Sequence, residues 1–482
     1  MRLKILLPGL LGTLIACQSR PLIVSTDAGL VSGTTNAAGD VRIFKGIPFA
    51  APPVGLLRWR EPQPVTSWTG VRRCVAFGPN PIQENWGVCS EDCLYLNVWA
   101  KKDYPPAKKP VIVWIYGGGF TEGTGASGWI DGEAMARKGV VFVTFNYRVG
   151  VLGFLAHPAL SLESPNHVSG NYGILDQIAA LRWVKRNIAA FGGDSANVTI
   201  AGQSAGACSV NILIASPLAR GLFRRAIGES GSFFQTENNM TLREAEEDGL
   251  HAMRGKNALT PEAMRALSPE ALLKSDYRRL PVVDGYVLPD HVDELSKKGA
   301  INKVDLITGY NAGDNFVEDT MSAAQFVAFA QRNYGTRANA FLTLYPVGSG
   351  HFQQDLSRDL IFGWEQYNWA KEEGARAYMY YFDRVPPGAP KMGAFHSAEV
   401  CYALHTLAHQ ARPWTPWDTT LSNLMSDYWV NFASTGDPNG KGLPPWPAFS
   451  AQKTKVLRFG DSVEVIDLPA MRAFAFFQPY PR

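Results

Sequence analysis

The sequence lacks a strong charge of either sign and has no repeated or low-complexity segment. Its 46 lysines and arginines nearly balance 43 aspartates and glutamates, for a net charge of +3 over 482 residues. The basic residues are scattered, and the densest group, Lys101, Lys102, Lys108 and Lys109, lies in a proline-containing loop. A nucleic-acid partner is therefore a poor hypothesis. Without a 20–50-residue repeat or a linker, the chain reads as one domain rather than an array.

Long apolar runs are also missing after the N-terminus, so no later segment is expected to span a membrane. Arg2 and Lys4 precede an apolar run from Ile5 to Ala16, which is too short for a bilayer but typical of a signal peptide. The run ends at Cys17 in a pattern that resembles the lipobox of bacterial lipoproteins. We expect residues 1–16 to be a signal peptide, residues 17–482 to be a single domain and Cys17 to carry a lipid. Simple cleavage near Ala16 or Ser19 is the alternative. The protein is then periplasmic or anchored to the outer membrane, or else secreted.

Cysteine is scarce. Export permits disulfides, but removing Cys17 leaves five cysteines, so at least one thiol has no partner within the chain. Spacing alone does not pair them.

Alternating strands and helices predict the fold class. The segments 110–116 and 140–146 are near-continuous apolar runs, as expected of strands buried on both faces. Apolar residues from 174 to 188 recur at helical spacing, and glycines near 192 favour the end of that helix. Further strands are expected at 225–228, 305–309 and 377–382, and the polar segment 238–279 is expected to form a helical cap. We predict an α/β fold with a central, mostly parallel twisted sheet, helices on both faces and helical cap insertions.

The pattern Gly202-Gln203-Ser204-Ala205-Gly206 follows the β-favouring run 198–200 and precedes a helix-compatible segment. This is the G-x-S-x-G pattern of a nucleophile elbow, in which a strained turn exposes the serine. Glycines on both sides let the backbone segments approach closely. A glycine-rich turn without chemistry is the alternative, and the context decides between the two.

A catalytic serine also needs backbone N–H groups for an oxyanion. Gly117-Gly118-Gly119 directly follows a predicted core strand, and the N–H of Ala205 follows the nucleophile. We expect Gly118, Gly119 and Ala205 to form the oxyanion hole.

In this class of hydrolase the chain order is serine, acid, histidine. Six histidines follow Ser204, at 251, 291, 351, 396, 405 and 409. His405 and His409 have a spacing compatible with metal ligation, but no third ligand accompanies them, so no metal is expected. His396 is favoured because a loop joins it to the predicted strand 377–382. Asp314 follows the strand 305–309 and is the first candidate acid, with Glu318 and Asp319 as alternatives.

From about Ile23 to the C-terminus the chain resembles the type-B carboxylesterase (cholinesterase-like) family of α/β-hydrolases. The resemblance rests on ordered motifs at 44–50, 90–97, 116–120, 170–177, 191–194, 202–206, 281–285 and 432–440. It implies Ser204 as nucleophile, His396 as general base and Asp314 as acid. It also implies that Gln203, Ser230 and Glu399 surround the triad, that Cys74 and Cys93 form a disulfide with Cys89 as competitor, and that no cofactor is used.

The chain departs from the family pattern at three positions. Most members have Glu followed by Gly where this chain has Asp314 and Asn315. Gln203 replaces the Glu that precedes the serine in cholinesterases, and Trp86 is out of spacing with their choline-binding tryptophan. A cholinesterase activity is therefore not expected.

We expect hydrolysis of a small-molecule carboxylic ester through an acyl-enzyme, by a monomer or homodimer. An amidase, thioesterase or lipase of the same fold is the nearer alternative, and a non-catalytic binding protein the remote one. Segments 238–279 and 351–369 are expected to shape the substrate pocket.

Overall fold

One sheet organises the part of the chain that the computed structural model describes, which is residues 22–102, 108–234, 239–277, 280–316, 320–372, 376–388 and 390–478. Its thirteen described strands are β1 (Leu22–Ser25), β2 (Leu30–Thr35), β3 (Val41–Pro48), β4 (Val71–Arg73), β5 (Tyr95–Lys101), β6 (Lys109–Ile115), β7 (Val141–Phe145), β8 (Gly193–Gln203), β9 (Arg225–Glu229), β10 (Asp305–Asn311), β11 (Ala377–Phe382), β12 (Lys455–Phe459) and β13 (Val463–Asp467).

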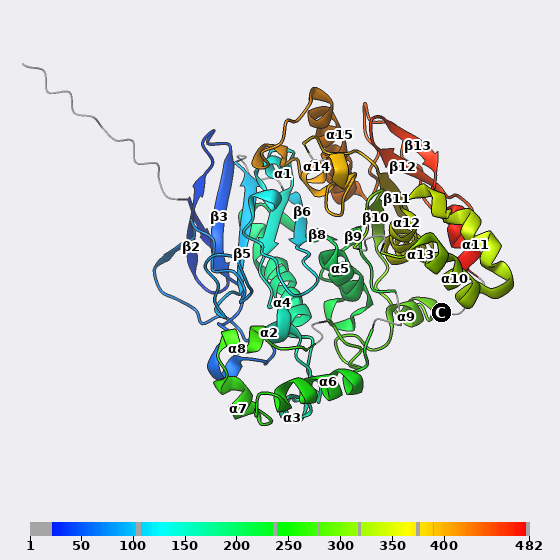
Figure 1. Cartoon of the computed structure of the whole chain (residues 1–482). Helices are drawn as coiled ribbons and strands as arrows, with labels where there is room; N and C mark the ends of the chain where they lie inside the picture. Colours follow the sequence, from blue (N-terminus) through cyan, green and yellow to red (C-terminus); the bar gives the residue numbers. More distant parts are fainter. Residues whose placement is uncertain are drawn as a thin grey trace, which may run out of the picture.

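The strand order is β1-β2-β3-β5-β7-β6-β8-β9-β10-β11-β12-β13, with β4 beside β2. All neighbours from β7 to β12 run parallel, whereas successive strands β1, β2, β3 and β5 at one edge and β13 at the other pair antiparallel. The added strand β4 pairs with β2 in parallel. Figure 1 shows the two edges far apart, with the parallel strands between them. Because parallel strands end at the same edge, the loops after β6, β8, β10 and β11 gather at one side of the sheet.

The helices are α1 (Glu133–Arg137), α2 (Gly150–Phe154), α3 (Pro158–Glu163), α4 (Tyr172–Asn187), α5 (Ala205–Ala215), α6 (Leu242–Arg254), α7 (Pro261–Ala266), α8 (Pro269–Leu273), α9 (Val292–Lys297), α10 (Ala323–Tyr334), α11 (Ala338–Leu344), α12 (Phe352–Ser357), α13 (Trp364–Glu372), α14 (Val400–Ala403), α15 (Pro416–Thr435) and α16 (Met471–Phe477).

Two cores lie on opposite faces of the sheet because the central strands are apolar on both sides. In β6, Val111 and Val113 belong to the core beneath α4 and α5, whereas Ile112 and Trp114 belong to the core beneath α1, α14 and α15. Successive side chains of a strand point to opposite faces, so an unbroken apolar run serves both cores. The predicted fold class is confirmed.

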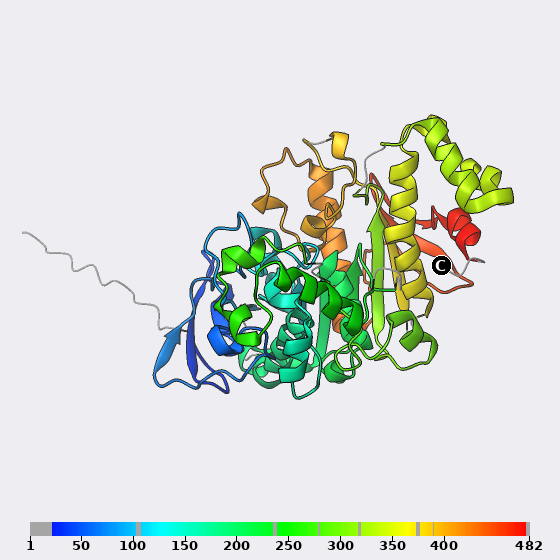
Figure 2. The same cartoon turned by 60° about the horizontal axis from the view of Figure 1, so that its bottom comes forward.

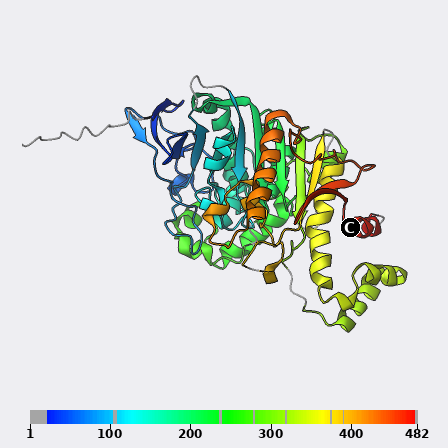
Figure 3. The same ribbon diagram turned by 90° about the horizontal axis from the view of Figure 1, so that it is seen from above.

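The expected central elements are present, and the cap is helical. Helices α6, α7 and α8 cover much of segment 238–279 and pack with α2 and α3 in a separate cluster around Trp59. Figure 2 shows this helical group in front of the sheet's lower part. A second helical group, α10 and α11, packs on α16, and Figure 3 shows it projecting beyond the sheet.

The cysteines differ from the expected pairing. Cys74, Cys89, Cys93, Cys208 and Cys401 are all free thiols, so the Cys74–Cys93 disulfide is not formed. Cys74 and Cys93 are buried in the main core, and the Cys74 Sγ points to the carbonyl oxygen of Gly46 at 3.9 Å. Burial raises the pKa of Cys74 to about 11 and that of Cys93 further. Both therefore act as small apolar core residues.

Residues 1–21, including Cys17, lie outside the described residues, as do Glu318 and Asp319. No helix in the described part is both long and apolar enough to cross a membrane.

Candidate active site

Ser204 occupies a sharp turn between β8 and α5, with φ 58° and ψ −127°. A non-glycine residue in this left-handed region costs about 1–3 kcal/mol and persists only where the surroundings impose it. The surroundings here are tightly packed backbone. A Cβ on Gly206 would lie 2.1 Å from the Ile115 carbonyl oxygen, and one on Gly231 would lie 2.3 Å from the Ser204 carbonyl oxygen. The Ser204 N–H donates to the Glu229 carbonyl oxygen at 2.8 Å, which fixes the turn against β9.

Asp314 follows β10 and is fully buried. Its Oδ2 accepts hydrogen bonds from the Ser230 hydroxyl at 2.7 Å and from the Asn311 N–H at 2.6 Å. Its Oδ1 lies 2.7 Å from Nδ1 of His396. The carboxylate is therefore held on one side and directed at the imidazole on the other.

The other imidazole nitrogen faces Gln203. His396 Nε2 lies 3.1 Å from Gln203 Nε2. Because Nδ1 donates its proton to Asp314, Nε2 of the neutral ring is an acceptor, and the Gln203 amide donates to it. Asp314 and His396 are thus joined, whereas the Ser204 hydroxyl makes no hydrogen bond within the described residues.

Two opposing effects act on the charge of His396. Burial lowers its pKa, but the hydrogen bond to Asp314 and the negative charges of Asp314 and Glu399 outweigh burial, so the pKa is raised above its ordinary value. The surroundings of His396 thus favour its protonated form more than water does.

The glycine loop after β6 lies against Ser204. A Cβ on Gly117 would come within 2.9 Å of the Ser204 Cβ. Gly118 and Gly119 have φ of 112° and 59°, and the Gly118 carbonyl oxygen accepts from the N–H groups of Thr121 and Glu122, which closes a tight turn. Among the described residues, the N–H groups of Gly118, Gly119 and Ala205 have no acceptor. Ala205 directly follows Ser204 in the chain, and Gly118 and Gly119 directly follow Gly117, which packs against Ser204.

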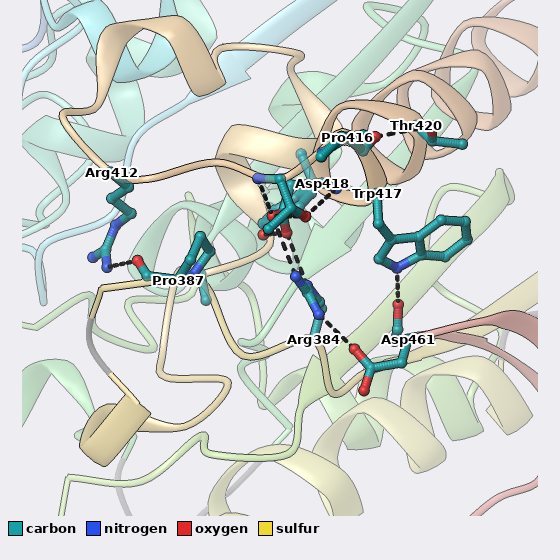
Figure 4. A network of polar contacts seen from close by, with 12 residues as sticks. Arg384, Pro387, Arg412, Pro416, Trp417, Asp418, Thr420 and Asp461 are labelled. Atoms are coloured by element: carbon teal, nitrogen blue, oxygen red, sulfur yellow. Dashed lines mark hydrogen bonds and ion pairs between the residues drawn. The ribbon is translucent and has the colours of Figure 1, made fainter.

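A polar network at the start of α15 fixes the loop that carries His396. Asp418 accepts from Arg384, twelve residues before the histidine, at 2.8 Å and from the hydroxyl of Tyr402, six residues after it, at 2.8 Å. Arg412 donates to the Pro387 carbonyl oxygen at 3.3 Å (Figure 4). Burial opposes ionisation of Asp418, but its hydrogen bonds, first that from Arg384, lower its pKa to about 2. Both ends of the histidine loop are therefore tied to one ionised carboxylate.

Two aromatic rings flank His396. The centroid of Phe316 lies 4.7 Å and that of Phe362 lies 5.0 Å from the imidazole centroid. The Phe316 side chain is 66% exposed, although its ring also packs against the buried ring of Phe362. Phe362 belongs to segment 351–369, which was expected to shape the pocket.

Comparison with known proteins decides the family. A model described as "Carboxylesterase family" matches residues 20–343 and 346–477.

The chain belongs to the carboxylesterase family.

It is 38% identical to the fumonisin B1 esterase of Sphingopyxis macrogoltabida, over 92% of this chain and 87% of that protein. It is 34% identical to the para-nitrobenzyl esterase of Bacillus subtilis, over 93% and 96% of the two chains. Carboxylesterase 1D of Rattus norvegicus is 32% identical over 95% and 93%. A solved structure of a PNB esterase superposes with a TM-score of 0.82 at 32% identity, covering 94% of this chain and 99% of that one. The protein is thus a carboxylic ester hydrolase with the α/β-hydrolase fold.

The sequence placed Gln203 near the triad, but two contacts of this carboxylesterase site were not predicted from it. The contact between Gln203 and His396 depends on the side-chain direction at the elbow, which no motif encodes. Phe316 lies two residues after Asp314, but its position beside the imidazole depends on how the loop after β10 folds. His405 and His409, noted for their spacing, take other roles, since His405 Nδ1 pairs with the Ser422 hydroxyl at 2.8 Å and His409 lies against Gly128.

Proposed function

We propose that this carboxylesterase cleaves its substrates through an acyl-enzyme on Ser204, with His396 as general base and Asp314 as the acid that orients it. The observation that carries the proposal is the 2.7 Å contact between Asp314 and His396 beside a serine in a strained elbow. The contact joins two residues that are 82 positions apart in the sequence.

In the first step His396 Nε2 releases the Gln203 amide and accepts the Ser204 hydroxyl proton while Oγ attacks the ester carbonyl carbon. Asp314 keeps the remaining ring proton on Nδ1 and offsets the charge of the imidazolium. The carbonyl oxygen becomes an oxyanion that accepts from the N–H groups of Gly118, Gly119 and Ala205, each contributing roughly 10²–10³ in rate.

The tetrahedral intermediate then collapses. His396 gives its proton to the leaving alkoxide, the C–O bond breaks and an alcohol departs, which leaves the acyl group on Ser204. Water attacks the acyl carbon in the second half, with His396 taking its proton and returning it to Oγ. The products are one alcohol and one carboxylic acid, and no cofactor enters this balance.

We propose a substrate with an apolar alcohol group. Because His396 protonates the leaving alcohol, side chains around the imidazole contact the alcohol rather than the acyl part. Phe316 and Phe362 make that side apolar. The names of the relatives supply the wider class, esters of small molecules.

The test is hydrolysis of p-nitrophenyl esters from acetate to palmitate by the wild type and Ser204→Ala. Folded Ser204→Ala should lose nearly all turnover and keep at most the roughly 10³–10⁴-fold rate over water that the oxyanion donors and binding supply. Substantial residual turnover by this variant would remove Ser204 from its role. Benzyl and methyl acetate, compared in the same assay, should differ in kcat/KM in favour of the benzyl ester.

We further propose that the chain is exported and lipidated on Cys17, on the grounds of the sequence pattern at its N-terminus. Mass analysis of the mature N-terminus in wild type and Cys17→Ser tests this. A soluble protein cleaved near Ala16 or Ser19 would contradict lipidation but leave export standing.

A further inference from the structure

Two glutamates that the mechanism does not use lie buried behind the triad. Glu229 ends β9 and Glu399 precedes α14, and neither is exposed to solvent. In each glutamate, one of the two carboxyl oxygens accepts a hydrogen bond. Glu229 Oε1 accepts from Trp429 Nε1 at 2.8 Å, and Glu399 Oε2 accepts from Asn311 Nδ2. In the described part of the chain, Glu229 Oε2 and Glu399 Oε1 have no donor.

The sheet brings both groups to one face, because Asn311, which donates to Glu399, and Gly309, which pairs with Glu229, are two residues apart on β10. Gly309 of β10 pairs with Glu229 on one side and with Tyr380 of β11 on the other. Since Gly309 has no side chain, the Tyr380 ring occupies that place, and a Cβ there would lie 2.4 Å from it. Trp429 packs on the same tyrosine, with centroids 5.7 Å apart. Glu229 therefore points into an enclosed space formed by β11 and α15.

The charges around the two carboxyl groups make double ionisation costly. Neither glutamate forms an ion pair with a lysine or arginine of the described residues. The titratable groups that face them are Asp314, His396, Tyr380 and Cys401. Burial raises the pKa of both carboxyls, and the negative charges of Glu229 and Asp314 raise that of Glu399 further. Because the charge of Glu229 opposes ionisation of Glu399, the two buried carboxyl groups cannot both ionise cheaply.

We propose that Glu229 and Glu399 share a single proton and act together as positioning residues for His396. The hydroxyl of whichever glutamate is protonated donates to the unpaired oxygen of the other. One proton thus satisfies both oxygens that lack a partner, and the pair keeps one negative charge.

This charge is coupled to the catalytic base. Asn311 links the groups, since its Nδ2 donates to Glu399 and, at 2.9 Å, to the carbonyl oxygen of Phe395, while its N–H donates to Asp314. The negative charge near Glu399 favours protonated His396. The inference rests on the proposed function only in taking His396 as the base.

Two substitutions at one position separate the charge states. In Glu229→Gln the amide oxygen still accepts from Trp429 and the NH₂ donates to Glu399, which stays ionised. The net charge is unchanged, so the acid limb of kcat/KM against pH should not move. In Glu229→Ala the unpaired Glu399 keeps a proton and the charge is lost, so the limb should move to lower pH by on the order of one unit.

Infrared difference spectra supply a readout that requires neither enzymatic activity nor a folded Glu229→Ala variant. The wild type should show the carbonyl band of a protonated carboxylic acid, and both Glu229→Gln and Glu399→Gln should lose it. If both carboxyl groups were ionised, the wild type would lack this band. Each glutamine variant would then remove one negative charge and shift the acid limb of kcat/KM to lower pH. If both were protonated, the band would persist in each glutamine variant. Either result would overturn the shared proton.

The two proposals fail differently. Turnover by Ser204→Ala would refute the proposed function without affecting the infrared band. Absence of the band would refute the shared proton and leave the esterase mechanism intact.

Discussion

Replacing Asp314 with Asn tests how the carboxylate controls the catalytic base. In the wild type one oxygen accepts from Ser230 and the Asn311 N–H, and the other accepts from His396 Nδ1. An asparagine must keep its carbonyl oxygen on the Asn311 side, because its NH₂ would meet an N–H donor there. The NH₂ then faces His396 and forces the ring proton onto Nε2.

The magnitude follows from the tautomer. With Nε2 protonated, His396 cannot accept the Ser204 proton, and the loss expected for this substitution in a serine triad is about 10⁴ in kcat, or about 5.4 kcal/mol. The side chains are nearly equal in size, so the fold should survive. Steady-state hydrolysis of p-nitrophenyl butyrate measures the loss, and thermal unfolding checks the fold.

Asp284→Asn is the matched control. Asp284 is also a buried aspartate, and its Oδ1 accepts from three backbone N–H groups, at 2.9, 2.8 and 3.0 Å. It contacts neither Ser204 nor His396, so its replacement should lower stability and leave kcat near the wild-type value. If Asp314→Asn kept more than about a tenth of wild-type kcat, the tautomer argument would fail, and Glu318→Gln would be the next variant to measure.

Three further predictions concern the scaffold and the base. Asp418→Asn should cost about 2 kcal/mol of unfolding free energy at pH 7, measured by denaturant titration. Because the folded pKa of Asp418 is lowered to about 2, this difference should vanish as pH falls from about 4 to 2, and a pH-independent difference would argue against the ion pair with Arg384. The raised pKa of His396 places the acid limb of kcat/KM above the ordinary imidazole value of about 6.5, with activity lost as pH falls through it; a limb below that value would contradict the charge balance described. Gly206→Ala should fail to accumulate as soluble protein, since its Cβ would lie 2.1 Å from the Ile115 carbonyl oxygen, and normal expression would show that the elbow relaxes.

Local patterns predicted the parts of the site that short segments determine. The elbow at Ser204 and the glycine loop at Gly118 each follow a buried apolar run, and strand, turn and helix are encoded within about fifteen residues. The central strands and the helix α4 were predicted for the same reason. The outermost strands β1 and β13 are short and half-exposed, so their weaker patterns gave no comparable signal.

Site residues that are far apart in the sequence could be predicted only from the chain order of the triad or from the family resemblance. Asp314 and His396 are 82 residues apart, and the residues alone left Glu318 and Asp319 open as acids. The Gln203 contact and the burial of Glu229 depend on strand register and on the missing side chain of Gly309. The disulfide between Cys74 and Cys93 that the resemblance implied was wrong, because both side chains lie in the core as separate free thiols.

Covalent labelling tests the central claim most directly. Intact-mass and peptide mass spectrometry after reaction with an organophosphate ester should show one adduct, on the peptide that contains Ser204, and no adduct in Ser204→Ala. An adduct on another residue, or catalysis of ester hydrolysis without any adduct, would contradict an acyl-enzyme at this elbow.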